Sequence, residues 1–203
     1  MRILMISGEF PPMQGGVGDY TREMARAFAA QGHTAAVLAP ASLSAAYQSP
    51  HGEPWQVLPT VSSWGWGCWW QVRDAIDALH PDVVNVQYQA AAYDMHSAAI
   101  NFLPWYLRRR PHARPSIVTF HDLKPPFLFP KAGPVRSWVV RRMARDSDAV
   151  IVTNTQDALT ADRWQLTSSG RPAVHQIPIG SNIPVQPPAD FCRLTWRSAH
   201  GYG

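Results

Sequence analysis

Residues 3–19 read ILMISGEFPPMQGGVGD. The unbroken apolar run at their beginning has the length of a strand, so it predicts a buried first strand within residues 1–7. The prolines and glycines behind it predict a loop, and Asp19 is suited to cap the helix that follows. That helix is expected to end at Gly32 and to pack three side chains, spaced four residues apart, on the sheet: Tyr20, Met24 and Phe28.

Four further apolar runs of similar length follow along the chain, at residues 35–39, 83–87, 116–120 and 149–153. Stretches with helical periodicity separate them. Near-continuous apolar strands that alternate with helices are typical of a parallel sheet buried on both faces. The predicted fold class is therefore α/β, a Rossmann-like parallel sheet with helices on both faces.

A later helix is expected to begin at Pro134, because proline suits the first position of a helix. Arg141 and Arg145 would point into solvent. The apolar side chains of this helix are expected to face the core: Val135, Trp138, Val139 and Met143. Asn154 or Thr155 is expected to cap the next helix.

Residues 41–70 are less regular, and we predict no strand there. They hold five tryptophans among Gly, Ser and Pro: Trp55, Trp64, Trp66, Trp69 and Trp70. Most of these rings are expected to fill the core or cover the sheet edge. An exposed subset would instead form an apolar platform for an acceptor or a membrane contact.

From Ile177 the composition changes, because prolines recur at positions that suit neither a helix nor a central strand. We expect one domain over residues 1–182, and over residues 183–203 a linker with the start of a further domain. A short helix is expected after Asp190.

The composition suits one ordinary globular core, since 46% of the 203 residues are hydrophobic and 16% are charged. No apolar run reaches the length of a membrane span or a signal peptide. Cys68 and Cys192 lack the spacing of a zinc site, so we expect reduced thiols in a cytoplasmic protein without metal or cofactor.

The net charge of +4 comes from arginine, grouped at residues 108–110 and along the helix from Pro134. Because the arginines are not interleaved with aromatics in a nucleic-acid-binding motif, we expect no nucleic acid partner. Phosphate groups or an anionic membrane are the expected partners, with Arg141 and Arg145 on the contacting face. A solvated face balanced by nearby carboxylates is the alternative.

Ligands of open parallel sheets bind outside the carboxyl ends of the strands, which directs attention to the side chains there. The loop with Gly15 and Gly16 follows the first strand and offers backbone N–H groups before a helix, although glycines needed only for tight packing would give the same pattern. The other expected side chains at this edge are polar: Gln87, Tyr88, Gln89, His121, Asp122 and Asn154. Such a set suits a carbohydrate or another polyol.

Four segments together resemble the retaining glycosyltransferase family 4, in the right order along nearly the whole chain. Residues 8–18, together with the helix end at residues 30–33, resemble the opening of the family. Residues 119–123 resemble its histidine segment, and residues 148–154 and 177–183 its approach to the interdomain hinge. The chain departs from the family in having Gly180-Ser181-Asn182 where Asn-Gly-x-Asp is more usual, and Asn154 where serine is common.

The resemblance implies the N-terminal, acceptor-side half of a GT-B glycosyltransferase that works without a metal. The Gly15–Gly16 loop would approach the donor phosphates and the acceptor, and His121 would contact the transferred sugar as the catalytic candidate. The nucleotide-sugar donor would lie mainly on a C-terminal domain, so this half alone is expected to be inactive. The acceptor would be a glycan, a lipid-linked molecule or a small molecule.

Two rival hypotheses remain at this point. One is a non-catalytic module that binds a glycan or a lipid head group. The other is half of a nucleotide-sugar epimerase or a dinucleotide-dependent oxidoreductase, which the lack of a GxGxxG motif disfavours.

Overall fold

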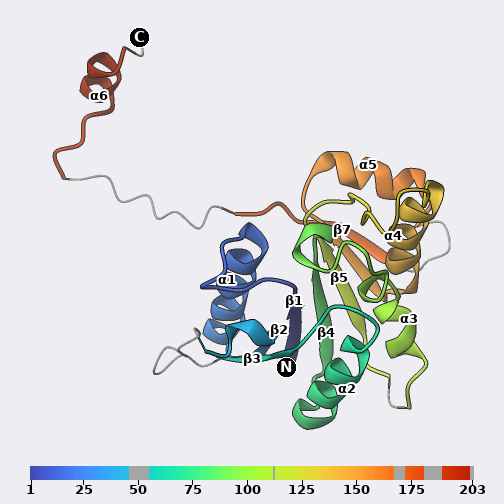
Figure 1. Ribbon diagram of the computed structural model, residues 1–203. Coiled ribbons are helices and arrows are strands. Elements are labelled where there is room, and N and C mark those ends of the chain that lie inside the picture. Colours follow the sequence, from blue (N-terminus) through green and yellow to red (C-terminus); the bar gives the residue numbers. More distant parts are fainter. Residues whose placement is uncertain (46–54, 112, 167–171, 181–188, 202–203) are drawn as a thin grey trace.

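The computed structural model describes residues 1–45, 55–111, 113–166, 172–180 and 189–201. Within them the chain forms a parallel sheet in the order β3-β2-β1-β4-β5-β6-β7 (Figure 1). The strands are β1 (Arg2–Ser7), β2 (Thr34–Pro40), β3 (Trp55–Val61), β4 (Val83–Tyr88), β5 (Ser116–Phe120), β6 (Ala149–Val152) and β7 (Ala173–Gln176). This confirms the Rossmann-like α/β fold.

Helices cover both faces of the sheet (Figure 1). They are α1 (Gly16–Ala30), α2 (Cys68–Leu79), α3 (Leu103–Arg108), α4 (Pro134–Asp146), α5 (Thr155–Arg163) and α6 (Arg193–Ala199), with short 3-10 turns η1 (Ala41–Leu43), η2 (Ala90–Ala92) and η3 (Ile100–Phe102). None of the described helices is both long and apolar enough to cross a membrane.

The core is divided into two clusters by the sheet. In one cluster α1 packs Met24, Ala25 and Phe28 against the side chains of β1 and β2. In the other, α2, α3 and α4 pack against the opposite face, where Tyr88 and Phe120 are fully buried. Because α1 and the later helices lie on opposite faces, side chains that alternate along one strand meet different surroundings.

Two strands were not predicted, and both lie at the edges of the sheet. β3 contains Pro59, which an edge strand tolerates because its free side needs no ladder hydrogen bond. β7 is only four residues long and mostly exposed, so it lacks the apolar run by which the inner strands were recognised. The predicted domain boundary at residue 182 lies outside the described residues.

Three predictions about the helices need correction. Helix α1 begins at Gly16, so Asp19 lies in its first turn and is not its N-cap. In α4, Val135 and Trp138 are 45% and 50% exposed, and the inward face turns toward Val140 instead. Arg141 does not project into solvent, because its Nη2 donates a hydrogen bond of 3.0 Å to the carbonyl oxygen of Trp164.

Other predictions hold. Helix α4 begins at Pro134, as predicted. Asn154 caps α5, its side-chain oxygen accepting a hydrogen bond of 2.8 Å from the backbone N–H of Asp157. Of the five tryptophans, Trp55 and Trp64 are buried and Trp69 packs partly buried against the core, as expected for most of them, whereas Trp66 and Trp70 are exposed.

Candidate functional site

A cleft of about 750 Å³ opens along α1. Its walls come from segments far apart in the sequence: the first turns of α1, Gln89 after β4, His121 after β5, and Ile179 with Gly180 after β7. The residues after β4, β5 and β7 all follow carboxyl ends of parallel strands, so the cleft lies where this class of fold binds its ligands.

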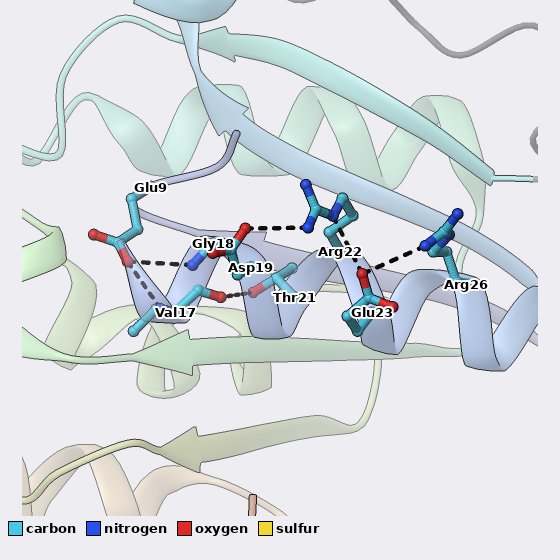
Figure 2. A network of polar contacts seen from close by, with 8 residues as sticks. All are labelled: Glu9, Val17, Gly18, Asp19, Thr21, Arg22, Glu23 and Arg26. Atoms are coloured by element: carbon cyan, nitrogen blue, oxygen red, sulfur yellow. Dashed lines mark hydrogen bonds and ion pairs between the residues drawn. The ribbon is translucent and has the colours of Figure 1, made fainter. Parts of the chain in front are cut away.

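The glycine-rich loop before α1 is held by the carboxylate of Glu9 (Figure 2). Its Oε1 accepts hydrogen bonds from the backbone N–H groups of Val17, at 2.9 Å, and Gly18, at 3.2 Å. These two groups at the helix start therefore already have a partner, contrary to the expectation that the loop offers them to a ligand. A negative carboxylate there also interacts favourably with the helix dipole.

The glycines of this loop serve different purposes. A Cβ at Gly15 would collide with the Glu9 carboxylate, and one at Gly18 would lie 2.9 Å from the Cα of Phe10. A Cβ at Gly16 would meet no atom within 4 Å, and Gly16 lines the cleft. Tight packing thus explains why residues 15 and 18 are glycines. At Gly16 no neighbouring atom requires a glycine, and the residue borders the open space of the cleft.

Two acidic residues of α1 line the cleft and were not among the predicted site residues: Asp19 and Glu23. Arg22 pairs with Asp19 at 3.3 Å and with Glu23 at 3.3 Å, and Arg26 lies 3.5 Å from Glu23 (Figure 2). Asp19 and Glu23 are four residues apart, which places both carboxylates on one helix face. This spacing is the signal in the sequence by which they could have been predicted as site residues. Carboxylates so placed can accept hydrogen bonds from ligand hydroxyls.

The imidazole of His121 is fixed by a chain of buried amides. Its Nε2 lies 2.9 Å from Oε1 of Gln87, and Nε2 of Gln87 donates a bond of 3.1 Å to Oδ1 of Asn85. That oxygen also accepts a bond of 3.2 Å from the hydroxyl of Thr119. Since Oε1 of Gln87 can only accept, Nε2 of His121 must carry the proton, which leaves Nδ1 as the acceptor.

The surroundings of His121 keep its ring neutral. The ring packs edge-on against Tyr20, with centroids 4.9 Å apart and planes at 83°. Burial lowers the pKa of His121 from 6.5 to about 4, and the nearby Asp122 opposes that shift only in part. At neutral pH the ring is therefore an uncharged hydrogen-bonding group.

Lowering the pH from about 6.5 to about 4 is expected to destabilise the fold through His121. The unfolded chain takes up a proton on this ring near 6.5, whereas the folded chain does so only near 4. The stability due to the neutral ring is thus fully present above 6.5 and is lost as the pH falls through this window. Melting temperatures measured across the window should fall more steeply for the unmodified chain than for His121→Gln; parallel curves would contradict this account.

The remaining predicted site residues differ in whether they reach the cleft. Gln87 is fully buried and reaches the cleft only through His121. Asp122 accepts a hydrogen bond of 3.3 Å from Nε2 of Gln89, which itself lines the cleft. Tyr88, expected at this edge, is buried on the opposite face of the sheet, where its hydroxyl accepts a bond of 2.9 Å from Asn101. Asn154 is the helix cap and does not line the cleft.

Comparison with known proteins finds a match to one family model and solved structures that share the fold. The sequence model of Glycosyltransferase Family 4 matches residues 14–168, more than half of the chain. The search of curated proteins found no match. Among solved structures, sucrose-phosphate synthase from Thermosynechococcus elongatus is 18% identical with a TM-score of 0.52. The alignment covers 90% of this chain and 91% of that chain.

Two plant structures share the fold as well. UGT2 from Phytolacca americana, complexed with UDP-2fluoro-glucose and pterostilbene, is 13% identical with a TM-score of 0.52, covering 97% of this chain and 56% of that chain. UGT89C1 from Arabidopsis thaliana, complexed with UDP-L-rhamnose, is 12% identical with a TM-score of 0.50, covering 91% and 53%. This chain thus spans about half the length of these two structures.

Proposed function

The chain belongs to glycosyltransferase family 4, and from this premise we propose that it forms the acceptor-side lobe of a GT-B glycosyltransferase. The enzyme transfers a sugar, of the hexosyl type, from a nucleotide-sugar donor to a glycan, lipid or small-molecule acceptor. The observation that carries the proposal is the cleft, which is lined by both the neutral ring of His121 and the backbone of Gly16.

The structural neighbours support the proposed kind of donor. Two of them are complexed with UDP-sugars or an analogue of one, and pterostilbene accompanies the donor analogue in the Phytolacca structure. Since this chain spans about half of each of them, the proposal places the donor mainly on a second lobe that closes over the cleft.

The proposed chemistry uses fixed dipoles and no titrating group on this lobe. A sugar hydroxyl donates to Nδ1 of His121, whose other nitrogen is already committed to Gln87. The loop at Gly15 and Gly16 approaches the donor phosphates, and Asp122 supports the same edge through Gln89. Preorganised groups of this kind stabilise the charge that develops as the sugar leaves the nucleoside diphosphate. We propose that the anomeric configuration is retained, and that the enzyme works in the cytoplasm.

The test is a product assay of the two-lobed protein against a panel of nucleotide sugars and acceptors, read as release of nucleoside diphosphate with formation of a glycosylated product. Transfer by the two-lobed protein and none by the 203-residue chain is expected, because the donor site needs the second lobe. Acceptor binding by both proteins without any transfer would favour the non-catalytic module. Transfer by the 203-residue chain alone would show the proposed division between lobes to be wrong.

A further inference from the structure

Five aromatic rings form a continuous band across the helices that cover the sheet face opposite α1. We call the following set the aromatic band: Trp66, Trp69, Phe102, Trp105 and Trp138. Their ring centroids follow one another at 6.2 Å from Trp105 to Trp69, 5.1 Å to Trp66, 5.9 Å to Phe102 and 5.8 Å to Trp138. The rings come from the turn before α2 and from α2 itself, from η3 and α3, and from the first turns of α4.

The band runs along the boundary between core and surface: Trp69 and Phe102 are partly buried against the core, whereas Trp66 and Trp138 are exposed. Trp66 is 55% exposed and Trp138 is 50% exposed, and Trp70 of α2, outside the band, is 59% exposed. Apolar side chains of this size are costly to leave in water, so the two exposed rings of the band, which Phe102 connects, favour an interaction site here. None of the band residues lines the cleft, so an occupant of the band leaves the cleft open.

Guanidinium groups stack on one ring of the band, Trp105, and on Trp70 of α2. Arg73 stacks over Trp70 at 4.8 Å, and Arg109 stacks over Trp105 at 4.3 Å. Asp74 offsets the charge of Arg73 at 2.7 Å, whereas Arg109 has no carboxylate partner among the described residues. The band therefore combines indole rings with uncompensated positive charge.

We propose that the aromatic band docks the chain on the surface of an anionic lipid bilayer. Indole rings settle at the depth of lipid head groups, where their apolar body and polar N–H are both satisfied. Arginine beside them keeps its charge at the head groups while its stem covers apolar surface, and anionic lipids attract that charge. This surface replaces the one expected from the sequence, because Arg141 of α4 is bonded to Trp164 and does not face outward.

The experiment is co-sedimentation with vesicles of phosphatidylcholine, with and without phosphatidylglycerol, at low and high salt. The variants Trp66→Ser and Trp138→Ser probe the rings, and Arg109→Glu probes the charge. Matched controls outside the band are Trp196→Ser, an indole that is 46% exposed on α6, and Arg145→Glu on α4. Circular dichroism verifies that every variant keeps its helices.

Binding should require phosphatidylglycerol and weaken with salt. Each tryptophan replacement should weaken it about tenfold, and Arg109→Glu about 30-fold because the charge is reversed, with both controls unchanged. Equal binding to neutral vesicles, equal losses in the controls, or no binding would overturn the proposal. Concentration-dependent self-association that Trp66→Ser abolishes would overturn it in favour of a second copy of the chain. Vesicle binding is measured without sugar transfer, so its outcome tests the membrane proposal separately from the proposed function.

Discussion

Replacing His121 with alanine in the proposed two-lobed enzyme is expected to lower the turnover number at least about tenfold. The substitution removes the only imidazole that lines the cleft among the described residues, and with it the Nδ1 that is proposed to accept a hydrogen bond from the sugar. It also leaves the buried Oε1 of Gln87 without its partner, which costs about 1–2 kcal/mol of stability. Initial rates at saturating donor and acceptor, with melting temperatures measured alongside, separate the two effects.

His96→Ala is the matched control, because His96 is exposed and does not line the cleft. Gln87→Ala should reproduce most of the loss, since Gln87 acts by holding the ring of His121. The double variant should then be little worse than His121→Ala alone, as expected for residues that act as a unit. Unchanged turnover in His121→Ala would assign His121 a purely structural role, and additive losses would show that Gln87 acts independently.

Gly18→Val is expected to lower the free energy of unfolding by about 3 kcal/mol. A Cβ at Gly18 lies 2.9 Å from the Cα of Phe10 and 3.1 Å from the carbonyl oxygen of Glu9, so the obstacle is backbone that cannot rotate away. Relieving the clash must move α1 away from the loop and weaken the hydrogen bonds to Glu9. Thermal unfolding should show a fall in melting temperature of about 10 °C.

Gly16→Ala is the matched comparison in the same loop. Its Cβ enters open space, so the melting temperature should stay within about 2 °C of that of the unmodified protein. The methyl group narrows the cleft instead, and the expected change is a higher KM for the donor. A large loss of stability at Gly16, or none at Gly18→Val, would reverse the roles that the structure gives these two glycines.

The sequence alone determined the features that depend on neighbours along the chain. Five of the strands, the helix start at Pro134 and the cap at Asn154 were predicted because periodicity and capping chemistry act over a few residues. The position of His121 at the mouth of the cleft followed as well, since it comes directly after a strand of the predicted parallel sheet and such strands end at one edge.

Only the tertiary structure decided which side chains share a surface. Gln87 and Tyr88 are neighbours at the end of β4, yet one joins His121 and the other fills the opposite core, because strand side chains alternate and the side that α1 covers is set by long-range packing. Long-range packing also decides that the α1 face with Asp19 and Glu23 lines the cleft, although their spacing along the chain places them on one helix face. The exposure of Trp66 and Trp138 likewise depends on how distant helices meet, which no local pattern encodes.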